Sequence, residues 1–472
     1  MSSVSALNSL LASSSSSSST INLSQILEAA LGASSEGIDV NSAVSAAVTA
    51  AEAPEQQWES QETTLQNQTS ALNQLQTDAT NLDNDMQALN NLLGPLSATT
   101  VTSSNSGVVT GSAVSGTASG NHVVVVNNLA TTDSWASGTV ASASTPLAGG
   151  SFTITGADGT VTTISTGTGT NTLNDVANTI NSDDLGVTAN VITDANGARL
   201  AIVSNSSGSA SDFSVSSGGG LSFSEVAQGN NASFSVDGLT LASASNTVTG
   251  AIPGMTLSLL SASPGTQVSL TVAPDTSQAS TAINQFVTDY NTLITAVNSQ
   301  FADSGSGQGV LATDPTLHNL QSELLGSLGY TYVPASGTTT VPNLSSLGIT
   351  VNNDGTLSVD SATLNNALQN NYSDVQSFFQ GSALNGFANS LDQQLTSFTS
   401  PADGAFTVDL QSISSEDSTL QTDVTNFQTN VIAPLQTQLQ SEYSQAEILL
   451  QQLPAEMKQI DEELGLNNSS NG

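Results

Sequence analysis

Apolar residues recur with a seven-residue period near both ends of this 472-residue chain. Between residues 38 and 93 a second apolar row follows the first, in the a/d pattern of a helix that packs along another helix. The same pattern returns between residues 384 and 465. A helix cannot bury its own apolar stripe, so we expect the two ends to pack together as an antiparallel stalk, and the stalks of neighbouring copies to stack.

The rows can be read directly from the printed sequence. The first seam consists of Ala51, Trp58, Leu65, Leu72, Ala79, Met86 and Leu93, with a second row of Leu75, Leu82 and Leu89. The second seam consists of Ile413, Leu420 and Phe427 with Val424 and Val431, and then of Leu439, Ala446, Leu453 and Ile460 with Tyr443, Leu450, Met457 and Leu464.

Pro54 predicts a kink or the true start of the long N-terminal helix, Gly94-Pro95 predicts its end, and Pro434 and Pro454 predict breaks or kinks.

The charge balance excludes several classes of partner. Lys and Arg number 2 against 39 Asp and Glu, for a formal net charge of −37, and the two cations are Arg199 and Lys458. Binding to nucleic acid or to an anionic membrane surface needs clustered cations, so neither is expected.

With 0 cysteines the chain forms no disulfide and no thiolate site. Its length exceeds the roughly 250–300 residues of a single core, which predicts several domains.

No catalytic, cofactor-binding or metal-binding residue is predicted. The two histidines, His122 and His318, are far apart in the sequence, and adjacent acids such as Asp183-Asp184 and Glu416-Asp417 point to different faces of an element. Asn353-Asp354-Gly355 is better explained as a hairpin turn than as a calcium loop, because the ligand spacing is absent. We therefore expect a protein that is not an enzyme.

The middle of the chain has the pattern of short antiparallel strands. Alternating apolar residues flank Asp237-Gly238, a two-residue hairpin signal, and strict alternation marks 255–259 and 268–272 as strands with one buried face. Residues 151–204 read as strand, turn, strand, short helix and a hairpin turning at Asn196-Gly197. Strong helical patterns follow at 276–302 and in one helix that carries Leu364, Leu368, Val375, Phe378 and Phe379.

The first 36 residues are small and polar, with a serine run and two apolar patches, and are expected to be disordered on their own. The first 198 residues contain no Lys or Arg, so an ordinary secretory signal is not expected. No apolar run approaches the roughly 18 residues of a membrane span. Even so, the composition is typical of an extracellular protein, which implies an export route without such a signal.

Four segments of the chain carry a resemblance to a known family. The first is Gly37-Ile38-Asp39-Val40, which opens the first seam. The other three are residues 233–241 with 245–257, residues 282–294, and residues 347–360 with Phe378-Phe379 beyond them. In this order the segments resemble the flagellar filament-capping proteins, the flagellar hook-associated protein 2 family. Residues 151–204 also resemble the repeat inserted in flagellins and their associated proteins.

The resemblance implies a secreted bacterial protein, exported by the flagellar type III apparatus, that sits at the filament tip. It implies a homo-oligomeric ring that helps flagellin fold and insert and prevents the loss of monomers, with flagellin and the hook-filament junction proteins as partners. Nucleic acid and membrane insertion are not expected. The alternative is an extracellular adhesin or structural fibre that binds surface glycans through its β-rich domains; a cell-wall hydrolase is disfavoured because no catalytic constellation is visible.

The expected fold is a multidomain α+β protein in which N- and C-terminal heptad helices form a stalk and β-rich head domains are inserted between them. The expected divisions are a disordered export or assembly segment (1–36), N-terminal coiled-coil helices (37–97), the first part of a β-rich head domain (98–135), an inserted α+β head domain (136–228, with the flagellin-type repeat at 151–204), the second part of the β-rich domain (229–273), the helix and hairpin part of the stalk (274–383), C-terminal coiled-coil helices (384–465) and a disordered tail (466–472).

Residues of the two seams are the candidates for contacts between copies or with flagellin. They are Leu65, Leu72, Leu75, Leu82, Met86, Leu89, Leu420, Val424, Phe427, Leu439, Leu450 and Leu453.

Overall fold

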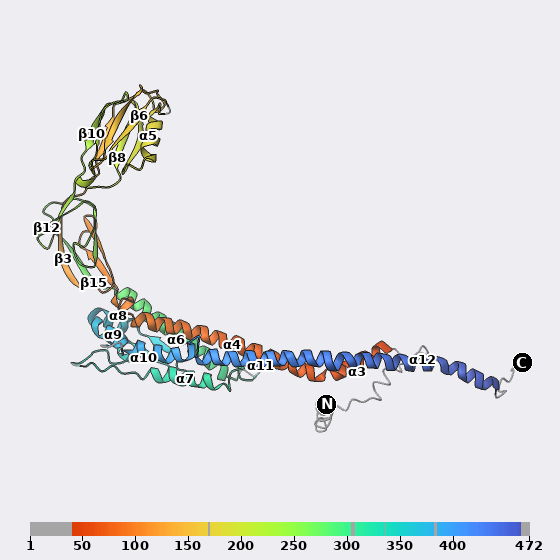
Figure 1. Ribbon diagram of the computed structural model, residues 1–472. Helices are drawn as coiled ribbons and strands as arrows, with labels where there is room; N and C mark the ends of the chain where they lie inside the picture. Colours follow the sequence, from red (N-terminus) through yellow and green to blue (C-terminus); the bar gives the residue numbers. More distant parts are fainter. Residues whose placement is uncertain (1–39, 169, 304–306, 336, 382–384, 464–472) are drawn as a thin grey trace. The chain divides into compact units, whose positions relative to one another are not determined.

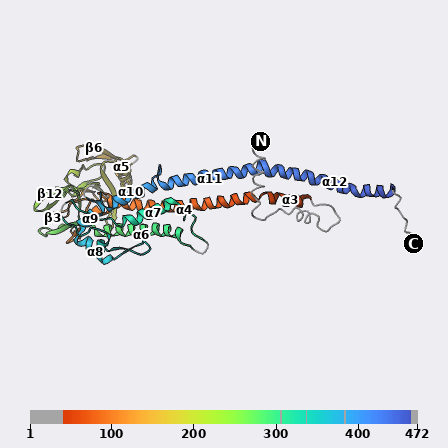
Figure 2. The ribbon, with the colours of Figure 1, turned by 90° about the horizontal axis from the view of Figure 1, so that it is seen from below.

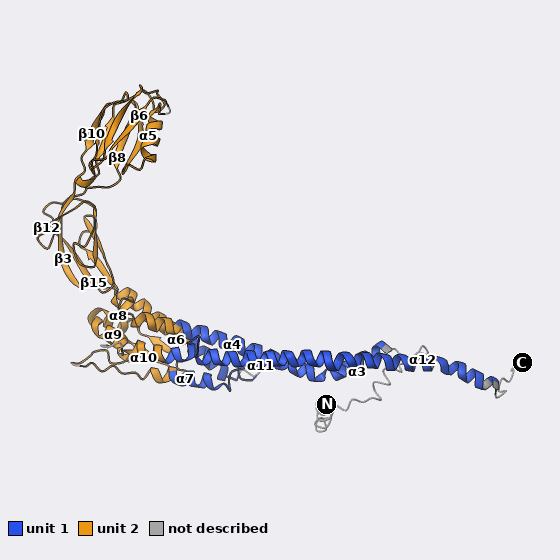
Figure 3. Cartoon of the chain, viewed as in Figure 1, with its two compact units in different colours: residues 1–81, 292–323, 394–472 blue, residues 82–291, 324–393 orange. Residues whose placement is uncertain are grey.

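The computed structural model describes residues 40–168, 170–303, 307–335, 337–381 and 385–463 (Figure 1). The segments expected to be disordered, 1–36 and 466–472, lie outside these ranges. The chain divides into two compact units (Figure 3): unit 1 takes residues 1–81, 292–323 and 394–472, and unit 2 takes 82–291 and 324–393. The β modules and the long helices occupy separate stretches of the chain, so the predicted multidomain α+β class is confirmed.

Unit 1 is built from helices of both chain ends. Its N-terminal part holds α3 (Val40–Ala51) and the first part of α4 (Ala53–Asn90), and its C-terminal part holds α11 (Ala405–Phe427), the π-helical turn η5 (Gln428–Ile432) and α12 (Ala433–Glu463). Sections of α6 (Thr276–Phe301), α7 (Pro315–Ser327) and α10 (Phe387–Thr399) complete it.

Within unit 1, α3 and the first part of α4 pair with α11 and the first part of α12. α3 packs against α12, and the two helices lie side by side in both views (Figures 1 and 2). Further along, the ring of Trp58 on α4 meets that of Phe427 on α11 edge to face, with centroids 5.2 Å apart. Gln421 Nε2 donates to Glu62 Oε1 at 3.2 Å. Residue numbers rise on one helix as they fall on the other, so the ends run antiparallel, as the heptad rows predicted.

The prolines act differently at three places. Pro54 is the second residue of α4, after a break at Glu52, so it marks the true start of the long helix. Pro434 is the second residue of α12 and follows η5; the extra residue of a π turn shifts the side-chain phase, which explains why the heptad rows change phase there. A break or a kink was expected at Pro454; the helix does not break there, because α12 continues through this residue.

The first β module of unit 2 has two antiparallel sheets with one core. One sheet holds β1 (Thr99–Ser103), β15 (Val268–Pro274), β3 (Gly120–Asn128), β11 (Ala232–Val236) and β12 (Leu239–Ser243), in this spatial order. The other holds β13 (Thr247–Thr249), β14 (Met255–Leu259) and β2 (Val109–Ala113). Alternate residues of β14 and β15 are buried, as predicted, and both sheets contribute to the same apolar cluster, which includes Val124, Phe234 and Leu257.

The inserted α+β module follows the predicted order of elements. One sheet holds β10 (Phe223–Ala227), β4 (Ser134–Ser137), β8 (Gly197–Ser204) and β7 (Val187–Asp194); the other holds β6 (Val161–Thr166), β5 (Gly150–Thr155) and β9 (Ser214–Val215). Helix α5 (Leu173–Ser182) begins with a capping box between Thr172 and Asp175. Two details differ from the sequence analysis. Gly197 pairs with Asp194, so the hairpin turns one residue earlier, and β4 already belongs to this module at Ser134.

The remainder of unit 2 is helical around one small hairpin. It contains the 3₁₀ turn η4 (Leu344–Leu347), β16 (Ile349–Val351), β17 (Leu357–Val359), α8 (Ser361–Asn370) and α9 (Tyr372–Gln380). The single helix expected here is wrong, because Asn371 leaves the helical region at φ −133° and ψ 34° and separates α8 from α9. The break lets the Phe378 ring stack on that of Phe387, with centroids 5.4 Å apart.

The contact between the rings of Trp58 and Phe427 gives a direct test of the antiparallel pairing. An edge-to-face aromatic pair contributes about 0.5–1.5 kcal/mol beyond its buried area. We expect Trp58→Ala and Phe427→Ala to lower the melting temperature of the helices, followed by circular dichroism, and a double-mutant cycle to return a coupling of about that size. Asn67→Ala, on the exposed face of α4, is the control. Zero coupling would contradict the pairing.

Asp85 of α4 and Asp289 of α6 interact inside unit 2. Burial, the hydrogen bond with Asp289 and the charge of Asp289 together raise the pKa of Asp85 to about 7, with burial the largest of the three causes. Gln285 Nε2 donates to Asp289 Oδ2 at 3.0 Å, which favours Asp289 as the acceptor in its hydrogen bond with Asp85. The two carboxyls therefore share a proton at mildly acidic pH.

The proton on Asp85 predicts the direction of the pH dependence. In the unfolded chain an Asp releases its proton near pH 3.9, about three pH units before the folded chain does. Between these values the folded state binds more protons, so the free energy of unfolding falls as pH rises toward about 7. In urea denaturation series from about pH 4 to 8, Asp85→Asn should flatten this fall, whereas Glu59→Gln on the exposed face of α4 should not.

Candidate assembly surface

Six of the predicted interface residues are core residues of the single chain. Leu65, Leu72, Leu75, Leu82, Met86 and Leu89 expose between 0% and 8% of their surface. This corrects their expected role, because such side chains have no surface left to offer a second molecule. The heptad row on α4 is covered by the chain's own helices, and sequence periodicity alone does not distinguish a partner in the same chain from one in another chain.

The predicted residues of the C-terminal helices have more surface. Leu420, Val424, Phe427 and Leu439 are half-buried, and Leu453 is 47% exposed. The side chain of Leu450 is outside those that the structure describes.

Beyond Leu439, large apolar side chains on α12 are exposed. We call this set the α12 stripe: Ile448, Leu449, Leu453, Met457 and Ile460, which are between 47% and 63% exposed. Residues 449, 453, 457 and 460 are separated by three or four positions and so lie on one face of the helix. Met457 and Ile460 belong to the heptad rows but were not among the predicted interface residues; Ile448 and Leu449 lie outside those rows and carried no signal.

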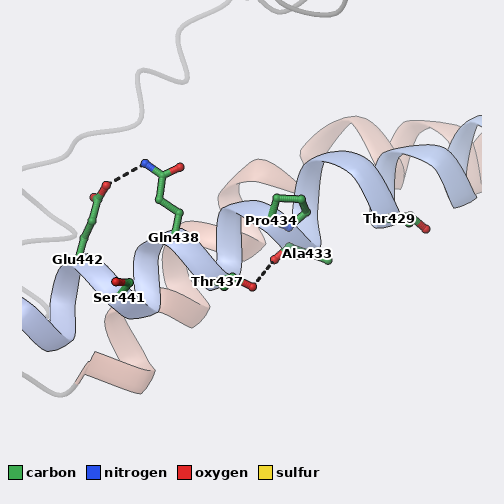
Figure 4. Close-up of a pocket in the computed structure, with 7 residues that line it drawn as sticks. All are labelled: Thr429, Ala433, Pro434, Thr437, Gln438, Ser441 and Glu442. Carbon is green, nitrogen blue, oxygen red and sulfur yellow. Dashed lines mark hydrogen bonds between the residues drawn. The ribbon is translucent and has the colours of Figure 1, made fainter.

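A shallow groove lies on the face of η5 and α12 shown in Figure 4. Its lining includes Thr429, Pro434 and Glu442, all from these two consecutive elements. Thr437 donates to the carbonyl of Ala433 at 2.9 Å, and Gln438 donates to Glu442 at 2.8 Å. Thr437, Gln438 and Glu442 are thus engaged along their own helix and do not converge on the groove as in a ligand site.

Carboxylates in the helices are held by amides. Gln421 bridges to Glu62, and Gln428 Nε2 donates to Glu55, in both cases from the C-terminal helices to α4. The same pairing occurs within α12, where Gln451 donates to Glu447 at 3.2 Å. A glutamine satisfies a carboxylate without neutralising its charge, so these helices retain a strongly negative surface.

The two histidines belong to different compact units, and each has a partner of its own. The ring of His318 stacks on Phe301 with centroids 4.6 Å apart, within unit 1. His122, on β3 in unit 2, has its Nδ1 2.8 Å from Asp237 Oδ2, and this contact lowers the pKa of Asp237. Asp354 binds Thr356 in the turn before β17, as a hairpin turn predicts. No helix in the described part of the chain is both long and apolar enough to span a bilayer.

Three family models match the chain. Residues 36–133 match the flagellar hook-associated protein 2 N-terminus, residues 229–455 the flagellar hook-associated protein 2 C-terminus, and residues 151–206 the flagellin hook IN motif. The B-type flagellar hook-associated protein 2 of Pseudomonas aeruginosa is 27% identical over 408 residues, covering 78% of this chain and 83% of that protein. The lateral flagellar hook-associated protein 2 of Vibrio parahaemolyticus is 30% identical over 173 residues, which is 36% of this chain and 37% of that protein.

A solved structure agrees with these matches. The crystal structure of the D1-D2-D3 domains of the flagellar cap protein FliD from Escherichia coli superimposes with a TM-score of 0.58 at 26% identity, covering 73% of this chain and 99% of that chain. The N- and C-terminal family models match the parts of the sequence on either side of the inserted module, and the flagellin motif matches the module itself. The chain belongs to the flagellar hook-associated protein 2 family.

Proposed function

We propose that this chain forms the cap at the extracellular tip of a bacterial flagellar filament, as a homo-oligomer that promotes the folding and insertion of flagellin and prevents the loss of monomers. The observation that carries the proposal is the match of both family halves to a chain whose two ends pair in antiparallel helices. This is a structural role and not an enzymatic one. Flagellin and the hook-filament junction proteins are its expected partners.

The α12 stripe supports the oligomeric part of the proposal. Exposed apolar residues at heptad positions favour another amphipathic helix as the partner, and the occupant we propose is the stalk of a second copy. Each copy would cover part of the stripe of its neighbour. Such contacts bury apolar surface and do not need the Lys or Arg side chains that this chain lacks.

Assistance to flagellin folding would come from confinement and from complementary apolar helix surface. The chain carries no Gly-rich phosphate loop followed by Lys, so the energy of nucleotide hydrolysis is not part of this mechanism. Entering flagellin would gain free energy by burying its own apolar helices, and the cap would delay their exposure to water.

A deletion strain tests the proposed function. We expect a strain that lacks this chain to secrete unpolymerised flagellin and to carry no filaments under the electron microscope, and the wild-type chain supplied in trans to restore them. Intact filaments combined with a loss of attachment would contradict the cap and favour an adhesin.

The stripe is tested in the same strain and on purified protein. Leu453→Ser combined with Met457→Ser should shift the sedimentation of the purified protein from oligomer to monomer and fail to restore filaments. Val226→Ser is the matched control, since Val226 is 65% exposed on β10 of the inserted module. An unchanged oligomer in the double variant would remove the stripe from the subunit contact.

A further inference from the structure

Within unit 2 the chain passes between the helices and the first β module at two points (Figure 3). The first is the link between α4 and β1, residues 91–98, which contains the 3₁₀ turn η2 (Pro95–Ser97). The second is the passage from β15 to α6 at Pro274 and Asp275. Where the two segments meet, the N–H of Asp275 donates to the carbonyl of Ala98 at 2.8 Å. Two short crossings of this kind would by themselves allow the module to swing, because a few residues at the ends of elements are enough to form a hinge.

Three polar side chains on one face of α9 contact the first link. Tyr372, Gln376 and Gln380 are separated by four positions each, so they project from the same side of the helix. The hydroxyl of Tyr372 donates to the carbonyl of Leu96 at 3.2 Å, and Gln376 Nε2 donates to Ser97 Oγ at 3.1 Å. We call this row of three side chains the α9 clamp.

The third member of the α9 clamp binds the end of α4. The side chain of Gln380 is 3% exposed, and its Nε2 donates to the carbonyls of Leu89 and Asn91 at 3.3 and 3.0 Å. The last carbonyls of a helix have no partner within that helix, so this amide supplies a donor from another part of the sequence. A buried carbonyl that loses such a donor costs free energy, which ties the start of the link to α9.

The link is in turn bonded to the base of the first β module. The carbonyl of Ser97 accepts the N–H of Gly116 at 2.8 Å, while the hydroxyl of the same residue is the acceptor for Gln376. Beside these bonds lies a groove whose lining includes Tyr372 and Gln376 of α9 and Thr117 of the module. At the groove, hydrogen bonds rather than close apolar packing therefore connect α9, through the link, to the module.

We propose that the α9 clamp fixes the orientation of the first β module on the helical part of unit 2, so that the two move as one rigid body. A rotation of the module about its two crossings would displace η2 from α9 and break the bonds of Tyr372 and Gln376. Gln380 holds the other end of the link in place while this happens. The three residues are positioning residues: they bind no partner, and they prevent the crossing from acting as a hinge.

Distances between spin labels test the orientation directly. The chain has 0 cysteines, so Thr240→Cys on β12 and Asn365→Cys on α8 place labels only at these two exposed positions, one on each side of the crossing. In the purified full chain, pulsed electron paramagnetic resonance should return one narrow distribution of distances. Tyr372→Phe combined with Gln376→Leu, the pair variant, should broaden this distribution by about twofold or more, because the module is then free to rotate about its crossings.

Hydrogen exchange measures the same loosening without labels. The amides of Gly116 and Asp275 both donate to the link, and in the pair variant they should exchange about tenfold faster. Amides in the pairing of β3 with β11 should exchange as in the wild type, which shows that the module itself stays folded. Gln267→Leu makes the same chemical change at an exposed position just before β15, and as the matched control it should alter neither measurement.

Gln380→Leu removes the third contact. We expect this variant to broaden the distance distribution and also to lower the melting temperature, since it leaves two carbonyls without their donor. Tyr372 and Gln376 are only partly buried, so the pair variant decides the question even if Gln380→Leu fails to fold.

Two results would overturn the clamp. One is a distance distribution that is equally narrow in the wild type and in the pair variant, and the other is a broad distribution in the wild type, which would indicate a hinge. Because these experiments use the purified chain, their outcome does not depend on whether the chain caps a filament.

Discussion

The antiparallel contact between the two chain ends is the constraint on which the rest of the structure depends. Every element between α4 and α11 in the sequence is inserted between two helices that contact each other. The β modules are therefore insertions into one helical stalk. The pairing closes a loop of several hundred residues, and such a loop costs little more chain entropy than a shorter one. The stalk can therefore carry large inserted modules, provided that its own contacts remain favourable.

The contrast between Leu72 and Leu453 shows where the periodicity stops being informative. Both occupy heptad rows, yet Leu72 is fully buried in one chain and Leu453 is 47% exposed. The sequence reveals that a stripe must be covered, because burial of apolar surface follows composition and spacing. It does not reveal what covers the stripe, because that depends on which helices the turns bring back alongside it.

Local signals predicted individual elements well and their connections less well. Asp237 and Gly238 both adopt positive φ, as a two-residue hairpin requires. These two residues were therefore sufficient to predict the turn. In the sequence, the π turn before Pro434 was visible only as a change in the phase of the heptad rows. The break at Asn371 could not be predicted, because no Gly or Pro marks it. The hydrogen bond from the N–H of Phe213 to Asp133 joins positions about eighty residues apart, a pairing that tertiary structure alone creates.

The scarcity of cations shapes the contacts of the acids in the helices of unit 1. Where a more ordinary helix would place Lys or Arg beside Glu, this one uses Gln, as in the contacts of Gln421 and Gln428 with α4. Amide-to-carboxylate hydrogen bonds satisfy the oxygens but leave the charge in place, so copies brought together in an assembly must overcome their mutual repulsion. Salt screens that repulsion without weakening any salt bridge in these amide contacts. If copies associate through their stalks as proposed, this chemistry predicts that association becomes more favourable as ionic strength rises, the opposite of an assembly held by ion pairs.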